Sequence, residues 1–297
     1  MRDGRLQILT PVFNDWAALR ILIERVSDAL ADAGLSAEML VVDDGSNAPR
    51  TELVAGPLRG LTAVRILTLA RNLGHQRAIA IGLAYAEEKL DPLAVVVMDG
   101  DGEDDPADVA RLIEKCRAEQ YQKIVFAQRA KRSERIGFRM FYRLYRALFR
   151  LATGSGVRVG NFSILPRVML QRVVSVPEIW NHYAAGVLKT RLPFTTIEAD
   201  RATRYAGESQ MNFSALVAHG LSAIAVSNDL LSTRLFIVML FATLLAVAST
   251  SPVAIAVTLF ITMMTGCFMF IALSARTEAE LVPQRDYRHY VHRVAEY

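Results

Sequence analysis

The sequence contains only two cysteines among its 297 residues, Cys116 and Cys267. Two cysteines so far apart do not build the disulfide framework that stabilises small secreted proteins, and they give no support for a zinc site. The first residues also lack the long apolar segment of a secretory signal, because they lead directly into a strand-like segment. We therefore expect a large domain that is not exported.

Charge is absent from two long stretches near the C-terminus, residues 235–249 and 253–275. As a helix, the second stretch is about 34 Å long, enough to cross a hydrocarbon layer of about 30 Å. The first is about 22 Å long and crosses only if the helix begins a few residues earlier. Soluble helices rarely stay apolar on every face over such lengths, so we predict two transmembrane helices in residues 229–276 rather than a buried helix pair.

Basic residues flank these stretches, whereas the connection between them is uncharged. They are Arg234 before the first stretch and Arg276, Arg285, Arg288 and Arg293 after the second. The positive-inside bias then places both ends in the cytoplasm. We expect a multi-pass protein of the cell inner membrane, with the large domain (residues 1–228) and a tail (residues 277–297) on the cytoplasmic side.

The net charge of +4 says little, but basic residues alternate with aromatic ones between Arg129 and Arg150. This pattern suits a nucleic-acid patch, an amphipathic helix on anionic lipid, or an ordinary solvated helix with an aromatic side in the core. Two membrane helices in the same chain favour lipid over nucleic acid. We therefore predict membrane-surface helices at about 133–152 and 211–228, and no nucleic-acid partner.

Short apolar segments alternate with helical patterns through the first half of the chain. The strand-like segments are 6–12, 38–42, 64–69, 94–98 and 124–127, and the helical ones are 16–33, 76–89 and 106–119. Such alternation predicts an α/β fold, with a parallel sheet covered by helices on both faces. In that architecture ligands bind beyond the carboxyl ends of the strands, where the polar motifs of this chain lie.

Two aspartates spaced i, i+2, Asp99 and Asp101, end the fourth strand-like segment. They begin a group of five acidic residues whose repulsion a cation would offset. Mg²⁺ and Mn²⁺ prefer hard oxygen ligands and take only one or two protein carboxylates beside phosphates and water. Asp101 is the best ligand candidate, with Asp99 beside it and Glu103 completing the shell. Residues 104–106 instead fit the start of a helix, with capping acids and a first-turn proline.

Two other strand ends carry candidate ligand groups. Asp44 could accept a hydrogen bond from a nucleotide base or, equally well, bond to the turn around Gly45. Arg71 and the segment that begins at Gly74 could supply a cation and backbone donors to phosphate, although strand-to-helix turns often carry such residues without a ligand.

Together these motifs resemble the family 2 glycosyltransferases, whose Rossmann-like nucleotide-binding fold is called GT-A. The matching residues are Pro11, Phe13 and Asn14, then Asp43, Asp44 and Ser46 for the D-D-x-S motif, then Asp99 and Asp101 for D-x-D. Residues 204–213, followed by two membrane helices, resemble the polyprenyl-phosphate group, which includes relatives of dolichol-phosphate mannose synthase and bactoprenol glucosyltransferase.

The resemblance implies metal-dependent, inverting sugar transfer from a UDP- or GDP-linked sugar to a polyprenyl phosphate of the undecaprenyl or dolichyl type. It implies Mg²⁺ or Mn²⁺ as cofactor, a role in cell-envelope glycan or lipid modification, and a homo-oligomer. The implied donor-binding residues are Pro11, Phe13, Asn14, Asp15, Asp44, Arg71, Gly74, Asp99 and Gly100. The implied acceptor-phosphate residues are Arg129, Arg143, Asn161, Arg204, Ser209 and Gln210. The implied catalytic residues are Asp101, Arg129 and Arg204, and the implied metal ligands are Asp99, Asp101 and Glu103.

The chain departs from the family pattern at two positions. Gln210 stands where relatives commonly have lysine, and Asn161 stands where many have aspartate, so no aspartate base is implied there. A transferase acting on a sugar hydroxyl remains an alternative, but processive relatives carry a Q-x-x-R-W segment that neither Trp16 nor Trp180 belongs to. A membrane-anchored binding subunit without turnover is a third possibility. The intact acidic cluster argues against it, whereas Asn161 and Gln210 leave it open.

Overall fold

The computed structural model describes residues 5–54, 56–129, 159–200, 202–206, 226, 228–249, 252–280 and 287–297. The chain divides into two compact units. The first comprises Met1–Lys131, Arg158–Asn212 and Pro283–Tyr297, and the second Arg132–Val157 and Phe213–Val282. Apart from residues 226 and 228, the predicted surface helices at 133–152 and 211–228 lie outside the described residues, as do Arg143, Ser209 and Gln210.

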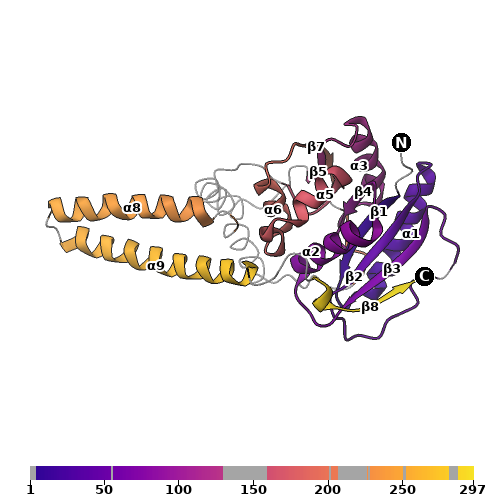
Figure 1. Cartoon of the computed structure of the whole chain (residues 1–297), viewed down its shortest axis with the longest axis horizontal. Coiled ribbons are helices and arrows are strands. Elements are labelled where there is room, and N and C mark those ends of the chain that lie inside the picture. Colours follow the sequence, from indigo (N-terminus) through magenta and orange to yellow (C-terminus); the bar gives the residue numbers. More distant parts are fainter. Residues whose placement is uncertain are drawn as a thin grey trace. The chain divides into compact units, whose positions relative to one another are not determined.

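The first unit is built on one sheet with the strand order β7-β5-β6-β4-β1-β2-β3-β8 (Figure 1). The strands are β1 (Leu6–Val12), β2 (Ala37–Asp43), β3 (Leu61–Leu69), β4 (Ala94–Val97), β5 (Ile124–Arg129), β6 (Ser163–Pro166), β7 (Phe194–Ala199) and β8 (Val291–Glu296). β1 pairs in parallel with β2 and β4, and β2 with β3. β1, β2 and β4 are buried along their whole length, as expected for a parallel sheet covered on both faces.

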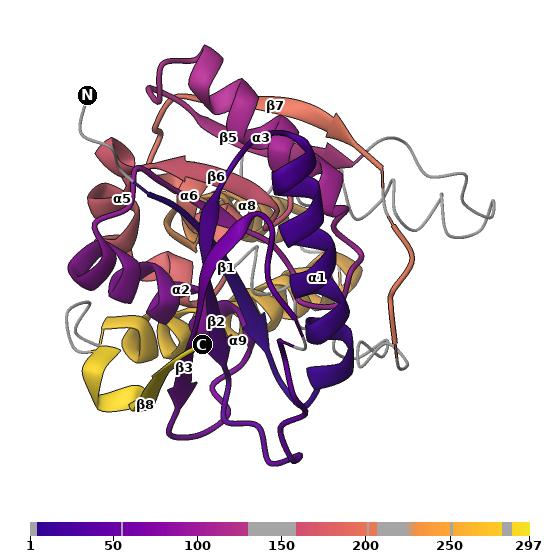
Figure 2. The same ribbon diagram turned by 90° about the vertical axis from the view of Figure 1, so that its right-hand side faces the viewer.

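The helices of the first unit are α1 (Trp16–Asp32), α2 (His75–Tyr85), α3 (Pro106–Ala118), α5 (Arg167–Val174) and α6 (Tyr183–Lys189). A π turn (Ala86–Leu90) continues α2, and a 3₁₀ turn (Pro177–Trp180) precedes α6. Figure 2 shows α1 and α3 on one face of the sheet and α2, α5 and α6 on the other. α1 buries Leu19, Ile23, Val26 and Leu30, which recur at helical spacing and face the sheet. The predicted α/β fold, with helices on both faces, is confirmed.

Antiparallel strands were not predicted. β6 lies between β4 and β5 and runs antiparallel to both, and β8 runs antiparallel to β3 at one edge of the sheet. β8 falls within residues 277–297, which the sequence predicts to be a tail, so that prediction is corrected for this segment. Its pattern gave no strong signal, because most of its side chains are exposed at the sheet edge.

A 3₁₀ turn (Tyr287–Tyr290) leads into β8 and ties it to α2 and the π turn. The Tyr287 hydroxyl donates to Glu88 over 2.7 Å, and the Tyr287 ring packs edge-on against Tyr85 with centroids 6.3 Å apart. Arg288 forms an ion pair with the same glutamate. The Arg288 and Tyr287 hydrogen bonds lower the pKa of Glu88 to about 2.

The second unit contains α8 (Asn228–Ser249) and α9 (Pro252–Glu280), which pack side by side as a helical hairpin (Figure 1). Thr258 of α9 donates a hydrogen bond to the Ala242 carbonyl of α8 over 3.1 Å. Large apolar side chains are exposed along both helices, including Phe241 at 68% and Phe270 at 73%. Among the described residues, no helix combines the length and the hydropathy that a membrane span requires.

Candidate active site

The carboxyl ends of β1, β2 and β4 meet at one edge of the sheet, because these strands are parallel neighbours. The Asp44 N–H donates to the Val12 carbonyl over 2.8 Å, which joins the turns after β2 and β1. The Asp44 carboxylate accepts from the Leu73 and Gly74 amides over 2.7 and 2.9 Å. Burial raises the pKa of Asp44, and these two hydrogen bonds oppose that shift.

These hydrogen bonds bear on the two roles that the sequence left open for Asp44. Asp44 does not bond to its own turn; Asp43 does so, by accepting from the Ser46 N–H over 2.9 Å. The Gly74 amide, which the sequence suggested as a donor to phosphate, donates to Asp44 in this structure. Asp44 instead fixes the start of α2 against the turn after β2.

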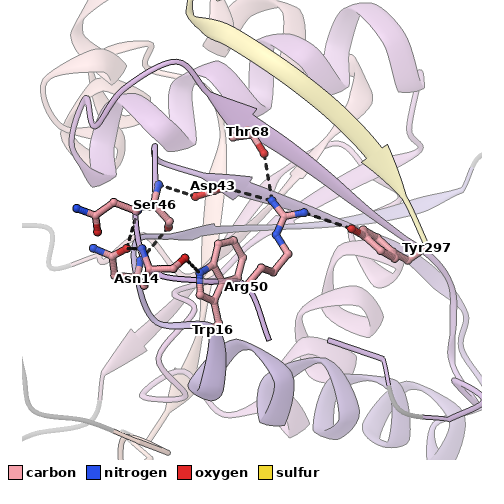
Figure 3. A network of polar contacts seen from close by, with 9 residues as sticks. Asn14, Trp16, Asp43, Ser46, Arg50, Thr68 and Tyr297 are labelled. Atoms are coloured by element: carbon pink, nitrogen blue, oxygen red, sulfur yellow. Dashed lines mark hydrogen bonds and ion pairs between the residues drawn. The ribbon is translucent and has the colours of Figure 1, made fainter. Parts of the chain in front are cut away.

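Asn14 joins two loops at the same edge of the sheet. Its amide oxygen accepts from the Asn47 and Ala48 N–H groups over 2.9 Å each, and its own N–H donates to the Ser46 hydroxyl over 2.9 Å (Figure 3). Its φ of 56° is a left-handed conformation that asparagine tolerates well. Asn14 therefore fastens the turn after β1 to the loop after β2, rather than offering that oxygen to a nucleotide.

Other predicted site residues lie in strands of the sheet or just after them: Pro11, Phe13 and Arg71 were predicted for the donor side, and Arg129 for the acceptor phosphate. Pro11 is buried in β1, and Phe13, just beyond the strand, is 44% exposed. Arg71 follows β3 and is exposed. Arg129 is the last residue of β5, where its backbone pairs with Ala199 of β7, and its side chain lies outside the described part of the chain.

The acidic turn after β4 is held by hydrogen bonds among its own residues. The Asp99 N–H donates to Asp104 Oδ2 over 2.9 Å, and the Glu103 N–H donates to Asp101 Oδ1 over 3.0 Å. Gly100 lies against β1, where an added Cβ would be 2.8 Å from the Pro11 carbonyl oxygen. The turn is therefore shaped by its carboxylates and by close backbone packing.

Helix capping explains only part of this acidic group. Asp105 is the N-cap of α3 and accepts from the Ala107 N–H over 3.0 Å, with Pro106 as the first helical residue. The capping prediction is confirmed for Asp105 and Pro106. It is wrong for Asp104, whose buried carboxylate orients the backbone at Asp99.

We predict that Gly102→Ala destabilises the protein by about 1–3 kcal/mol, because an alanine at this position would be both strained and crowded. Its φ is +86°, and an added Cβ would lie 2.4 Å from the Tyr205 ring. Gly34→Ala is the matched control, since Gly34 has φ +65° but nothing within 4 Å. Chemical denaturation of both variants measures the difference. Equal losses would show that the contact with Tyr205 adds nothing to the backbone strain.

Arg204 brings a distant segment onto the acidic turn. Its Nη1 donates to Asp101 Oδ2 over 3.1 Å, and its Nη2 forms an ion pair with Asp15. The three side chains are only 20%, 23% and 23% exposed, in the order Arg204, Asp101 and Asp15. The Tyr205 N–H also donates to the Asp101 carbonyl over 3.1 Å. Two strand-end carboxylates thus share one guanidinium, a group that also binds phosphate through paired hydrogen bonds.

His75, the first residue of α2, links Asp99 to Asn161. Its Nε2 lies 3.1 Å from Asp99 Oδ1 and 3.1 Å from Asn161 Nδ2. Partial burial lowers the pKa of His75, but the charges of Asp99, Asp101 and Asp44 outweigh burial and raise it above the ordinary value. The raised pKa of His75 thus reflects the negative charge gathered at this edge.

A small pocket lies beside this link, at the ends of β4, β5 and β7. Asp99 and Asn161 line it together with Asp104 and Asp200. Nothing in the sequence singles out Asp200, because it follows an edge strand with no clear burial pattern. Nor does the sequence give His75 a role of its own, since a lone histidine after a glycine carries no specific signal.

The three predicted metal ligands do not form a three-carboxylate site. Within the described ranges, no group of three or more histidine, cysteine, aspartate or glutamate side chains is arranged to hold a metal ion. The Asp101 oxygens are held by the Glu103 amide and Arg204, and Asp99 is paired with His75. Asp99 and Asp101 alone still suit Mg²⁺ or Mn²⁺, which complete their coordination with phosphate oxygens and water.

Residues 7–174, more than half of the chain, match the family described as Glycosyl transferase family 2. The chain belongs to this family. Undecaprenyl-phosphate 4-deoxy-4-formamido-L-arabinose transferase of Pectobacterium atrosepticum is 27% identical over 220 residues, covering 71% of this family 2 chain and 64% of that protein. The chain therefore spans less than two thirds of this relative's length.

Solved structures show the same fold for this family 2 chain. Mannosyl-3-phosphoglycerate synthase from Rubrobacter xylanophilus has a TM-score of 0.57 at 16% identity, covering 78% of this chain and 75% of that one. Glucosyl-3-phosphoglycerate synthase from Mycobacterium tuberculosis, in complex with Mn²⁺, UDP-glucose and phosphoglyceric acid, has a TM-score of 0.52 at 17% identity, covering 78% and 80%. The first unit is thus an α/β domain of the GT-A type.

Proposed function

We propose that this chain transfers a sugar from a nucleotide diphosphate to a polyprenyl phosphate at the cytoplasmic face of a membrane. Membership of family 2 supports glycosyl transfer, and the named activity of the Pectobacterium relative supports undecaprenyl phosphate as the acceptor class. The lipid-linked sugar would serve cell-envelope glycan or lipid modification.

The observation that carries this proposal is the position of Arg204 between Asp101 and Asp15. It places a basic side chain from the downstream segment beside the carboxylates at the strand ends. When the acceptor binds, its phosphate can replace one carboxylate as a partner of the guanidinium. Arg204 then orients the acceptor phosphate beside the anomeric carbon.

Residues of this chain position the reactants rather than move a proton. An acceptor phosphate oxygen attacks the anomeric carbon, and the bond from that carbon to the diphosphate oxygen breaks with its electron pair leaving on the nucleotide diphosphate. A phosphate monoester is already anionic near neutral pH, so it needs placement more than a general base. Asn161 in place of aspartate is consistent with this chemistry. Direct attack inverts the anomeric centre.

Asp99 and Asp101 would hold the divalent cation, which when bound compensates charge on the leaving diphosphate. The Mn²⁺ in the mycobacterial synthase complex supports Mg²⁺ or Mn²⁺ for this site. His75 would keep Asp99 in place through its 3.1 Å contact.

Membrane attachment through the α8–α9 hairpin is part of the proposal. Its support is the absence of charge from residues 235–249 and 253–275, together with the exposed large apolar side chains of both helices. A hairpin of this kind would keep the first unit near its lipid acceptor, and it could also join copies of the chain into a homo-oligomer.

Membranes containing the full chain test the proposal when incubated with labelled UDP- and GDP-sugars, undecaprenyl phosphate and Mg²⁺ or Mn²⁺. Label in an organic-extractable polyprenyl-phosphate sugar is the expected result. Label only in polymer would instead support a hydroxyl acceptor, and no label from any donor would support a binding subunit. Asp101→Asn is the low-activity control, since Gly102→Ala is expected to destabilise the protein.

A further inference from the structure

Arg50, in the loop after β2, joins four segments of the first unit (Figure 3). Its Nη2 lies 3.4 Å from Asp43 Oδ2 and donates to the Thr68 hydroxyl of β3 over 3.3 Å. Its Nη1 donates to the Tyr297 hydroxyl over 3.3 Å, just beyond β8. The guanidinium also lies over the Trp16 ring at the start of α1, 4.9 Å from the ring centroid.

The pairing with Asp43 bears on the shape of the donor-side loop. The Asp43 side chain is only 3% exposed, and its second oxygen accepts from the Ser46 N–H. A buried carboxylate needs partners for its charge, so the contact with Arg50 offsets the charge of Asp43 and helps to keep the turn closed. The next residue along the chain is Asp44, which fixes the start of α2.

Trp16 connects the contacts of Arg50 to the turn after β1. Its indole N–H donates to the Ala48 carbonyl over 3.2 Å, and Asn14 binds the Ala48 N–H. The cation above the ring adds to this packing. Arg50 therefore acts on the loops after β1 and β2, which carry Asn14 and Asp44 among the predicted donor-binding residues, although it lies outside every motif of the family pattern.

Tyr297 connects Arg50 to the C-terminal segment through its hydroxyl group. β8 pairs with β3 along residues 65–69, and Arg65 pairs with Glu296, so the backbone that carries Tyr297 is well fixed. Thr68, which binds Arg50, lies opposite Arg293 in this pairing. The C-terminal segment, which the sequence suggested to be a tail, is thus connected through Arg50 to the loop that follows β2.

We propose that Arg50 is a positioning residue for the nucleotide half of the donor, and that Tyr297 of the C-terminal segment holds Arg50 in place. The inference rests on the proposed function, because it takes the strand-end loops to be the nucleotide site. Arg50 does not touch the reacting atoms. It keeps the loop around Asp43 and Asp44 in the conformation that binds a nucleoside diphosphate.

Four variants of the full chain separate this role from a purely structural one. Arg50→Ala removes the guanidinium and all its contacts. Arg50→Lys retains a positive charge for Asp43 without the planar guanidinium, and Tyr297→Phe removes a single hydroxyl. Arg59→Ala is the control, since Arg59 pairs with the exposed Asp28 and Asp32 on α1. Tyr297→Phe decides the matter if Arg50→Ala does not fold.

Binding of UDP and of GDP, each with MgCl₂, is titrated by Trp16 fluorescence after Trp180→Phe leaves one tryptophan. We expect about tenfold weaker binding for Arg50→Ala and about threefold for Tyr297→Phe, with Arg50→Lys between them and Arg59→Ala unchanged. With the donor found by the lipid-label assay, KM for the donor should rise by similar factors while KM for polyprenyl phosphate stays constant.

Nucleotide binding that is unchanged in both Arg50→Ala and Tyr297→Phe would overturn the inference, even if both variants unfold at lower temperature. That result would leave the proposed function intact. A wild-type chain that binds neither nucleotide and labels no lipid would overturn the proposed function, and this inference with it.

Discussion

Asp101→Asn is expected to lower the rate of sugar transfer by about 10²–10³-fold in a folded protein. Asparagine has the shape of aspartate, but it lacks the charge that would hold a divalent cation and attract Arg204. Its amide group would also face the guanidinium, which lies 3.1 Å from Asp101 Oδ2. Initial rates across a range of Mg²⁺ and Mn²⁺ concentrations measure the loss, which should be accompanied by a weaker response to metal.

Asp105→Asn is the matched control for this prediction, because it makes the same chemical change in the same acidic group. Asp105 caps α3, and asparagine caps a helix about as well as aspartate. The control should keep both its activity and its stability. If Asp101→Asn retained normal turnover with an unchanged metal response, the assignment of Asp101 to the metal and the diphosphate would be wrong.

Arg204→Ala is expected to reduce transfer by a similar factor of about 10²–10³, with a higher KM for polyprenyl phosphate and little change in nucleotide binding. The variant removes the guanidinium from two largely buried carboxylates, so it should also lose about 1–3 kcal/mol of stability. Arg204→Lys should recover part of the stability but little of the activity, because an ammonium cannot bind two groups in one plane. Steady-state kinetics in both substrates separate these effects.

Arg111→Ala provides the comparison for Arg204→Ala. Arg111 also pairs with a largely buried aspartate, Asp108, but on α3 rather than at the strand-end carboxylates. It should lose stability without a change in KM for the lipid. A normal KM for polyprenyl phosphate in folded Arg204→Ala would remove Arg204 from the acceptor site.

The sequence predicted the central layers of the fold well, because strong patterns control them. The first strand-like segment coincides with β1 (Leu6–Val12), and the predicted limits of α1 and α3 each extend one residue beyond those in the structure. β6, β7 and β8 were not predicted. β6 is only four residues long, and β7 and β8 are edge strands whose exposed side chains follow no clear alternation.

The candidate site was predictable in its parts but not in its connections. Motif spacing identified Asp99 and Asp101, the family resemblance implied Arg204, and the structure brings Arg204 onto Asp101. The sequence could not show that the Asn14 side chain would bind a neighbouring loop, since that depends on the distance between two turns far apart in the sequence. Nor could it show that Glu103 would not complete a three-carboxylate cluster. Such contacts arise from tertiary packing, which no local pattern encodes.

Mass spectrometry of both products is the most direct test of the central claim that an acceptor phosphate displaces a nucleotide diphosphate. The purified full chain would be incubated with its donor, undecaprenyl phosphate and Mg²⁺, and the lipid and nucleotide fractions analysed together. The account predicts a lipid with one phosphate between polyprenol and sugar, formed in equal amount with nucleoside diphosphate. A lipid with two phosphates, formed together with nucleoside monophosphate, would contradict it.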